Sequence, residues 1–155
     1  MLQAGDKAPL FTLPDADGVR VALRDLLDGP VVLYFYPKDD TPGCTTQACG
    51  IRDAWSEFEA AGATVVGISP DDVASHARFR DKFDLPHLLL ADPDRKAIDK
   101  YGAWGEKKMY GRTYEGVLRS TFLVGADGRI ARVWPKARPK QHAEEVLAAL
   151  AELSG

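Results

Sequence analysis

The segment YFYPKDDTPGCTTQACG, Tyr34–Gly50, leads from a strand into a helix and contains both cysteines of the chain. The apolar run from Val31 to Tyr36 has the length and continuity of a strand that is covered on both faces. Residues 43–61 carry apolar side chains at three- and four-residue steps, which predicts a helix that ends at Gly62. Cys44 therefore lies where a strand gives way to a helix, at the edge of an α/β sheet where ligands usually bind.

The same alternation of strands and helices extends over the rest of the chain. It predicts a β-α-β-α-β order followed by a hairpin and a helix, hence a mixed sheet with helices on both faces. The simplest such fold is a thioredoxin-like α/β sandwich with an N-terminal β-hairpin extension. We read residues 102–119 as an ordered loop, because glycines and aromatic residues alternate there without a period. The other expected elements are a hairpin at 11–23, strands at 63–69 and 86–92, helices at 70–83 and 93–102, a hairpin at 120–134 and a helix at 139–153 with Pro139 near its first turn.

Length and charge place the chain among ordinary globular proteins. Its 155 residues fit a single domain, residues 1–155, and its net charge of −3 gives no general attraction to nucleic acid or to anionic membranes. The first residues have neither the basic nor the apolar region of a signal peptide, and the longest apolar run is too short to span a bilayer. We therefore expect a cytoplasmic protein, in which a cysteine pair is more often transient and catalytic than a permanent brace.

Cys44 and Cys49 lie five residues apart, which is neither a zinc-site spacing nor the redox spacing C-x-x-C. In the first turn of a helix, unpaired backbone N–H groups and the positive end of the helix dipole favour a thiolate over a thiol. Thr41 supplies a hydroxyl group, and Gly43 lets another molecule approach the backbone closely. From the residues alone, Cys44 is equally well explained as a reactive thiol or as a small buried side chain after a turn.

A resemblance to a known family changes this balance. PKDDTPGC fits the P-x-x-x-T-x-x-C signature of peroxiredoxins, with Pro37, Thr41 and Cys44 at the required positions. TPGCTTQACGIRD and YGRTYEGVLRSTFLV closely resemble the bacterioferritin comigratory protein, or PrxQ, subgroup. The resemblance covers nearly the whole chain, from GDKAPLFTL to the terminal helix, and it implies a thioredoxin-like fold.

The resemblance also assigns roles to individual residues. It makes Cys44 the peroxidatic cysteine, which attacks the terminal oxygen of the peroxide. Thr41 then holds the peroxide through its hydroxyl group, and the backbone N–H groups of Gly43 and Cys44 bind its oxygens. Pro37 shields the thiolate from water, and Arg119, in LRSTF, stabilises the thiolate and the charge that develops on oxygen. Without the resemblance, Arg119 reads as a solvated base that opens a strand.

Other residues keep two interpretations. Gln47 either supports the arginine, as Glu or Gln does in relatives, or faces solvent as an ordinary helix residue. The side chains in 102–119 either line an apolar entrance for organic peroxides or simply pack; they are Trp104, Met109 and Tyr110. The histidines are scattered and none has a metal-like spacing, so we assign them no chemistry; they are His76, His87 and His142.

Cys49 is the only other thiol in the chain and, by the resemblance, the resolving cysteine. A sulfenic acid on Cys44 condenses readily with a nearby thiol. We expect an atypical two-cysteine peroxidase that reduces hydrogen peroxide and organic hydroperoxides, is reduced by thioredoxin, needs no metal or cofactor and is a monomer. The alternatives are a thioredoxin-like disulfide reductase or isomerase, which the missing C-x-x-C disfavours, and a redox sensor or holdase.

Overall fold

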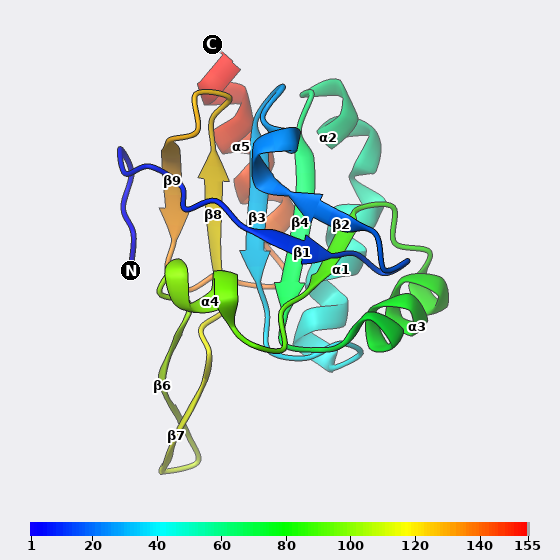
Figure 1. Cartoon of the computed structure of the whole chain (residues 1–155), viewed down its shortest axis with the longest axis vertical. Helices are drawn as coiled ribbons and strands as arrows, with labels where there is room; N and C mark the ends of the chain where they lie inside the picture. Colours follow the sequence, from blue (N-terminus) through cyan, green and yellow to red (C-terminus); the bar gives the residue numbers. More distant parts are fainter. Residues whose placement is uncertain (155) are drawn as a thin grey trace.

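A computed structural model of the chain describes residues 1–154 and has a five-stranded mixed sheet at its centre (Figure 1). Two short two-stranded ribbons and the helices surround this sheet. The elements in chain order are β1 (Thr12–Pro14), β2 (Arg20–Ala22), the 3₁₀ helix η1 (Leu23–Leu26), β3 (Val31–Phe35), α1 (Pro42–Asp53), α2 (Trp55–Ala60), β4 (Thr64–Ser69), α3 (Val73–Phe83), β5 (Leu88–Ala91), α4 (Lys96–Lys100), β6 (Trp104–Met109), β7 (Arg112–Val117), β8 (Ser120–Val124), β9 (Ile130–Trp134) and α5 (His142–Ser154).

The central sheet has the strand order β5-β4-β3-β8-β9. Strands β3, β4 and β5 run parallel to one another, whereas β8 is antiparallel to β3 and β9 is antiparallel to β8. All five residues of β3 are buried, as its continuous apolar sequence predicts for a central strand. The register pairs Phe35, the last residue of β3, with Ser120, the first residue of β8. The residue before β8 and the loop after β3 therefore meet at one edge of the sheet.

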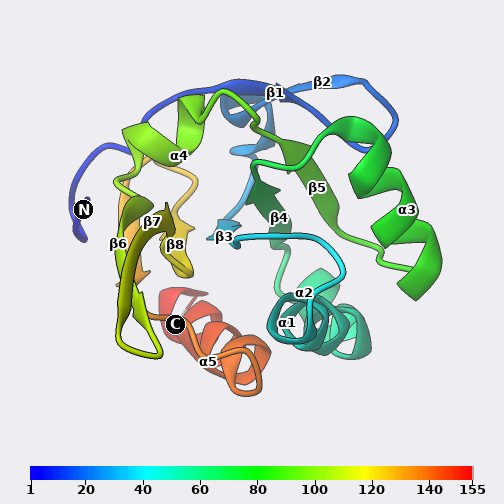
Figure 2. The same cartoon turned by 90° about the horizontal axis from the view of Figure 1, so that it is seen from below.

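Each face of the sheet has its own apolar core, because alternate residues of a strand point to opposite faces. Helices α1, α2 and α5 cover one face, and α3 flanks the β5 side (Figure 2). The N-terminal β1–β2 ribbon, η1 and α4 cover the other face. Cys44 belongs to the core under α1 and α5, together with Tyr34, Ala48 and Val146. The thiol is thus built into the packing between sheet and helices.

The prediction of an ordered loop for residues 102–119 is wrong. Strands β6 and β7 form a hairpin there that projects from the body of the molecule (Figure 1). Tyr110 and Gly111 form its two-residue turn with positive φ angles of 51° and 76°, as a type I′ turn requires. Most side chains of the hairpin are exposed. Because neither strand has a fully buried face, the sequence lacks the alternating apolar pattern from which most strands are predicted.

All four predicted helices differ from the structure in their bounds; α3 and α4 each begin three residues later than predicted, and α4 ends two residues earlier. The helix expected at 43–61 is divided at Ala54 into α1 and α2, and the Ala54 N–H is shared between the carbonyls of Gly50 and Ile51. The terminal helix begins at His142, so Pro139 lies before its first turn. Residues 138–141 instead form a turn, in which the Gln141 N–H donates to the Arg138 carbonyl. Within residues 1–154, no helix combines the length and the apolar character needed to cross a membrane.

Candidate active site

Cys44 occupies the third position of α1, and its side chain is only 1% exposed. The helix begins with Pro42, which has no N–H, and the Thr45 N–H makes the first intrahelical bond, to the Thr41 carbonyl at 2.8 Å. Helix geometry leaves the N–H groups of Gly43 and Cys44 without an intrahelical acceptor. The sulfur therefore lies beside free backbone donors at the positive end of the helix dipole, an environment that favours a thiolate.

Arg119 provides a cation at the same place. Its Nη2 donates to Cys44 Sγ at 3.3 Å, and its Nη1 donates to Gln47 Oε1 at 2.9 Å. Arg119 directly precedes Ser120, so the pairing of β8 with β3 brings its guanidinium over the start of α1. Gln47 is fully buried, so the interpretation as a solvent-facing helix residue is wrong. The two contacts fix the plane of the guanidinium against the thiol.

Gly43 leaves the space that the guanidinium occupies. A Cβ atom at this position would lie 3.1 Å from Arg119 Nη2 and 3.8 Å from Pro139 Cγ. Any larger residue would push the arginine away from the sulfur. Pro139, which we expected only as a helix residue, therefore lies near the first turn of α1. Sequence reasoning did not connect it with Cys44.

Thr41 and Pro37 lie in the loop between β3 and α1. The Thr41 hydroxyl donates to the Lys38 carbonyl at 2.8 Å, which leaves its oxygen lone pairs as acceptors. Thr41 is the N-cap residue of α1, but its side chain makes no capping bond. Pro37 is half-buried and follows the last buried residues of the β3 segment. Both residues flank the sequence that leads into the first turn of the helix.

Tyr34, on strand β3, lies in the same apolar core as the Cys44 thiol. Its hydroxyl group is 2.7 Å from His87 Nε2, and its ring stacks on Tyr36. Burial, and after it the negative charge of Cys44, raise the pKa of Tyr34 well above its usual value. Tyr34 therefore stays protonated. Burial also lowers the pKa of His87, to about 3, so this histidine is neutral.

A cavity of about 810 Å³ opens on the other side of Arg119. Leu118, Pro135 and Ala137 give it an apolar part. Lys107 also lines it and donates from Nζ to the Val117 carbonyl. Burial, and after it Arg119, lower the pKa of Lys107, whereas Cys44 opposes that shift. The cavity thus combines an apolar wall with the cations of Lys107 and Arg119, and of these Arg119 contacts the Cys44 sulfur.

The three side chains proposed for an apolar entrance lie elsewhere on the hairpin. Tyr110 is 97% exposed at the tip, and Met109 is 54% exposed beside it. Trp104 packs at the base of the hairpin, where Arg95 stacks over its ring at 4.1 Å. None of these three side chains lines the cavity beside Arg119. The interpretation as simple packing fits Trp104, and the tip residues face solvent.

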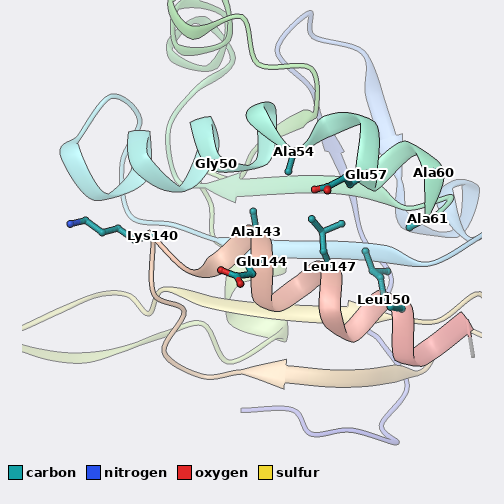
Figure 3. Close-up of a pocket in the computed structure, with 11 residues that line it drawn as sticks. Gly50, Ala54, Glu57, Ala60, Ala61, Lys140, Ala143, Glu144, Leu147 and Leu150 are labelled. Atoms are coloured by element: carbon teal, nitrogen blue, oxygen red, sulfur yellow. The ribbon is translucent and has the colours of Figure 1, made fainter.

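Cys49 is half-buried on α1, and both thiols are free. Five residues of α-helix separate their Cα atoms by about 7.5 Å along the axis and by roughly 140° around it, which gives about 8.7 Å in all. Next to Cys49, Gly50 lines a groove of about 700 Å³ between α1–α2 and α5 (Figure 3). A Cβ atom on Gly50 would be 3.9 Å from that of Ala143, so small residues form this contact. The helix that carries both thiols is thus lightly packed on this side.

Comparison with known proteins agrees with this geometry. The AhpC/TSA family matches residues 4–133. A putative peroxiredoxin Bcp from Coxiella burnetii is 47% identical over 149 residues, which cover 96% of this chain and 99% of that relative. The chain belongs to the AhpC/TSA family of peroxiredoxins.

Solved structures of peroxiredoxins have the same fold. A cysteine-to-serine mutant of PrxQ from Xylella fastidiosa aligns with a TM-score of 0.93 and 34% identity over 100% of this chain and 99% of that one. The bacterioferritin comigratory protein of Xanthomonas campestris, studied for its alkyl peroxide reduction activity, aligns with a TM-score of 0.88 and 36% identity over 94% and 92%. The predicted thioredoxin-like sandwich and the resemblance to this subgroup are therefore confirmed.

The histidines of this peroxiredoxin are all buried and all have polar partners, although no sequence pattern singles them out. His142 Nε2 is 2.8 Å from the Thr121 hydroxyl oxygen, and burial lowers its pKa to about 4. His76 Nδ1 is 2.7 Å from Asp39 Oδ2. The partner of His76 is 37 residues away in the chain. Since such pairs form only through the tertiary fold, no local sequence signal could reveal them.

Proposed function

We propose that this peroxiredoxin reduces hydrogen peroxide and organic hydroperoxides through Cys44 as the peroxidatic thiol. The observation that carries the proposal is the 3.3 Å contact between Arg119 Nη2 and Cys44 Sγ, with Gln47 bracing the other guanidinium nitrogen. A buried sulfur held by a cation at a helix N-terminus has the environment of a reactive thiolate. The family relationship supports the same reaction.

In the first step, the Cys44 thiolate attacks the terminal oxygen of the hydroperoxide. A sulfur–oxygen bond forms, the peroxide bond breaks, and the leaving alkoxide or hydroxide takes up a proton. Arg119 and the N–H groups of Gly43 and Cys44 are placed to stabilise the negative charge that moves from sulfur to oxygen. The Thr41 hydroxyl oxygen, whose hydrogen is used by the Lys38 carbonyl, accepts a hydrogen bond from the incoming peroxide. The products are an alcohol or water and a sulfenic acid on Cys44.

In the second step, the Cys49 thiol condenses with the sulfenic acid, and water leaves as the disulfide forms. A disulfide requires Cα atoms within about 4.4–6.8 Å, less than the roughly 8.7 Å that α1 imposes. The start of α1 therefore has to unwind before Cys49 can react. An external dithiol then reduces the disulfide in two thiol exchange steps. We propose thioredoxin for this role, since the disulfide of an unwound segment is open to a protein reductant.

We further propose that residues 1–155 act as one domain, as a monomer and in the cytoplasm, where a thioredoxin system is present. Light scattering of the reduced and the oxidised protein measures the oligomeric state in both forms. A mass of one chain in both is the expected result.

A coupled assay tests the function. The protein is mixed with thioredoxin, thioredoxin reductase and NADPH, and hydrogen peroxide or cumene hydroperoxide is then added. A peroxidase consumes NADPH continuously and only when peroxide is present. Consumption with disulfide substrates alone would indicate a disulfide reductase instead. One stoichiometric oxidation that then stops would indicate a redox sensor.

A further inference from the structure

A buried hydrogen-bond network lies in the loop just before the active site, and no step of the peroxidase reaction uses it. Its centre is the carboxylate of Asp39, which is 7% exposed. The Tyr36 hydroxyl donates to Oδ1 at 2.6 Å, and the Ser75 hydroxyl donates to Oδ2 at 2.8 Å. His76 Nδ1 is 2.7 Å from the same Oδ2. Three side chains thus meet on one buried carboxyl group.

His76 is fully buried and has an acceptor at each ring nitrogen. Nε2 is 3.0 Å from the Leu90 carbonyl oxygen, which can only accept a hydrogen bond. Nδ1 faces Asp39, which already accepts from two hydroxyl groups. Nε2 therefore has to donate to the Leu90 carbonyl, and Nδ1 and Asp39 Oδ2 share a single hydrogen bond at 2.7 Å. The ring thus connects the Asp39 carboxyl group to strand β5 through two buried hydrogen bonds.

Asp71 comes close enough for the cluster to be considered as a metal site, since ligand atoms of Asp39, Asp71 and His76 lie within 4.8 Å of one another. The contacts favour hydrogen bonds. At 2.7 Å, Nδ1 and Oδ2 are nearer than two ligands that each lie about 2.0–2.1 Å from one tetrahedral zinc ion. Asp71 Oδ2 moreover accepts from the Asp39 N–H and from the Ser69 hydroxyl.

The network fixes a strained turn. Asp40, the next residue, has a φ of 56°, in the left-handed region that disfavours residues with a side chain. Thr41, at the N-cap position of α1, follows directly, so the direction of this turn decides where Cys44 meets Arg119. Asp39 is held on both its backbone N–H and its carboxylate, by Tyr36 just after β3, by His76 of α3 and by Asp71 of the β4–α3 segment. Strained conformations of this kind persist where their surroundings hold them.

We propose that His76 and Asp39 are positioning residues for the peroxidase reaction. The ring of His76 ties the loop at Asp39 to strand β5 and so holds Thr41 and Cys44 in the geometry that Arg119 completes. The proposal rests on the proposed function, because it concerns the rate at which Cys44 reacts. It adds two residues that the peroxidatic signature does not specify, since Asp39 occupies one of its variable positions and His76 comes from α3.

The first test compares two matched variants, His76→Gln and His87→Gln. Each removes a buried histidine, but only the first disturbs the Asp39 loop. A glutamine amide has one donor group and one acceptor, so it cannot donate to both Asp39 and Leu90. We expect the rate of Cys44 oxidation by hydrogen peroxide to fall at least about tenfold in His76→Gln, equal to about 1.4 kcal/mol, and to stay near the wild-type value in His87→Gln.

The free energy of unfolding is measured for both variants, so that a loss of rate can be separated from a loss of stability. Wild-type oxidation in His76→Gln would overturn the proposal while leaving the proposed function intact. Equal slowing in both variants would also overturn it, since burial alone would then be the cause. A wild-type protein that does not react with peroxide would instead refute the proposed function.

The second test needs neither a variant nor activity. Ring ¹⁵N chemical shifts of His76 show which of the two ring nitrogens carries a proton. Burial raises the pKa of Tyr36 well above its usual range, so this hydroxyl remains a donor to Asp39. A proton on Nε2, which donates to the Leu90 carbonyl, is expected, and an unprotonated Nε2 would overturn the assignment.

Discussion

Oxidation of Cys44 and Cys49 to a disulfide should unwind the first half of α1. In the reduced helix their Cα atoms are about 8.7 Å apart and face different sides, whereas a disulfide tolerates at most about 6.8 Å. A shortening of about 2 Å cannot be accommodated by side-chain rotation alone. The segment from Cys44 to Gly50 must therefore lose its helical hydrogen bonds in the oxidised protein.

The local sequence and packing keep the free energy of unwinding α1 low. Thr45 and Thr46 are weak helix formers, and the Thr46 hydroxyl already bonds to the Pro42 carbonyl, which competes with the backbone ladder. On the outer side of α1, the contact with α5 is made by small residues beside a groove (Figure 3). The main loss on unwinding is the burial of Cys44 and Ala48 in the core.

Hydrogen exchange measured by mass spectrometry on both redox forms tests this prediction. Amides of residues 45–50 should exchange at least about tenfold faster in the oxidised form, the factor that corresponds to about 1.4 kcal/mol of opening free energy. Amides of β3 and β4 should be unchanged. Peroxide-treated Cys49→Ser, which cannot form the bond, is the control and should keep its protection. Equal protection in both forms, with the intramolecular disulfide confirmed, would refute the reasoning.

Three further predictions concern single substitutions and pH. Arg119→Met should slow Cys44 oxidation at least about tenfold, because a charge-assisted hydrogen bond worth roughly 1.5–3 kcal/mol is lost. Stopped-flow kinetics with hydrogen peroxide measures the oxidation rate, and a wild-type rate would contradict the prediction. Gly67→Ala should destabilise the protein by about 1–3 kcal/mol in urea, because its Cβ would lie 2.7 Å from the buried Tyr34 ring; unchanged stability would be the contrary result. Burial lowers the pKa of His87 from 6.5 to about 3, so this histidine is neutral in the folded protein. Its contribution to the free energy of unfolding is present above pH 6.5 and is lost as the pH falls toward 3. The loss between pH 7 and pH 5 should be about 2 kcal/mol, and His87→Gln should lack this pH dependence.

The sequence is most informative where burial produces a simple pattern. The run that forms β3 is buried on both faces, so its continuous apolar sequence predicted a central strand, and the thiol after it followed directly. The hairpin β6–β7 was missed for the opposite reason. Its strands extend away from the core, so backbone pairing rather than side-chain burial defines them, and the sequence carries no periodic signal.

The site itself could be predicted only in part. Cys44, Thr41 and Gly43 are neighbours in the chain and were found together. Arg119 lies 75 residues from Cys44 and reaches it only because β8 pairs with β3, so it was identified by family resemblance rather than by pattern. The Asp39–His76 pair was missed altogether, because it depends on how α3 packs beside the loop after β3. Contacts of this kind are fixed by tertiary structure, so no local sequence pattern predicts them.

The most direct test of the account is the mass of the protein after a single addition of hydrogen peroxide. Cys49→Ser should gain one oxygen atom on Cys44, which a sulfenic acid reagent then traps, whereas the wild-type protein should lose two hydrogen atoms as the Cys44–Cys49 disulfide forms. Cys44→Ser should be unchanged under the same conditions. Oxidation of Cys44→Ser at the wild-type rate, or a wild-type protein that stays reduced, would contradict the assignment of Cys44 as the peroxidatic thiol.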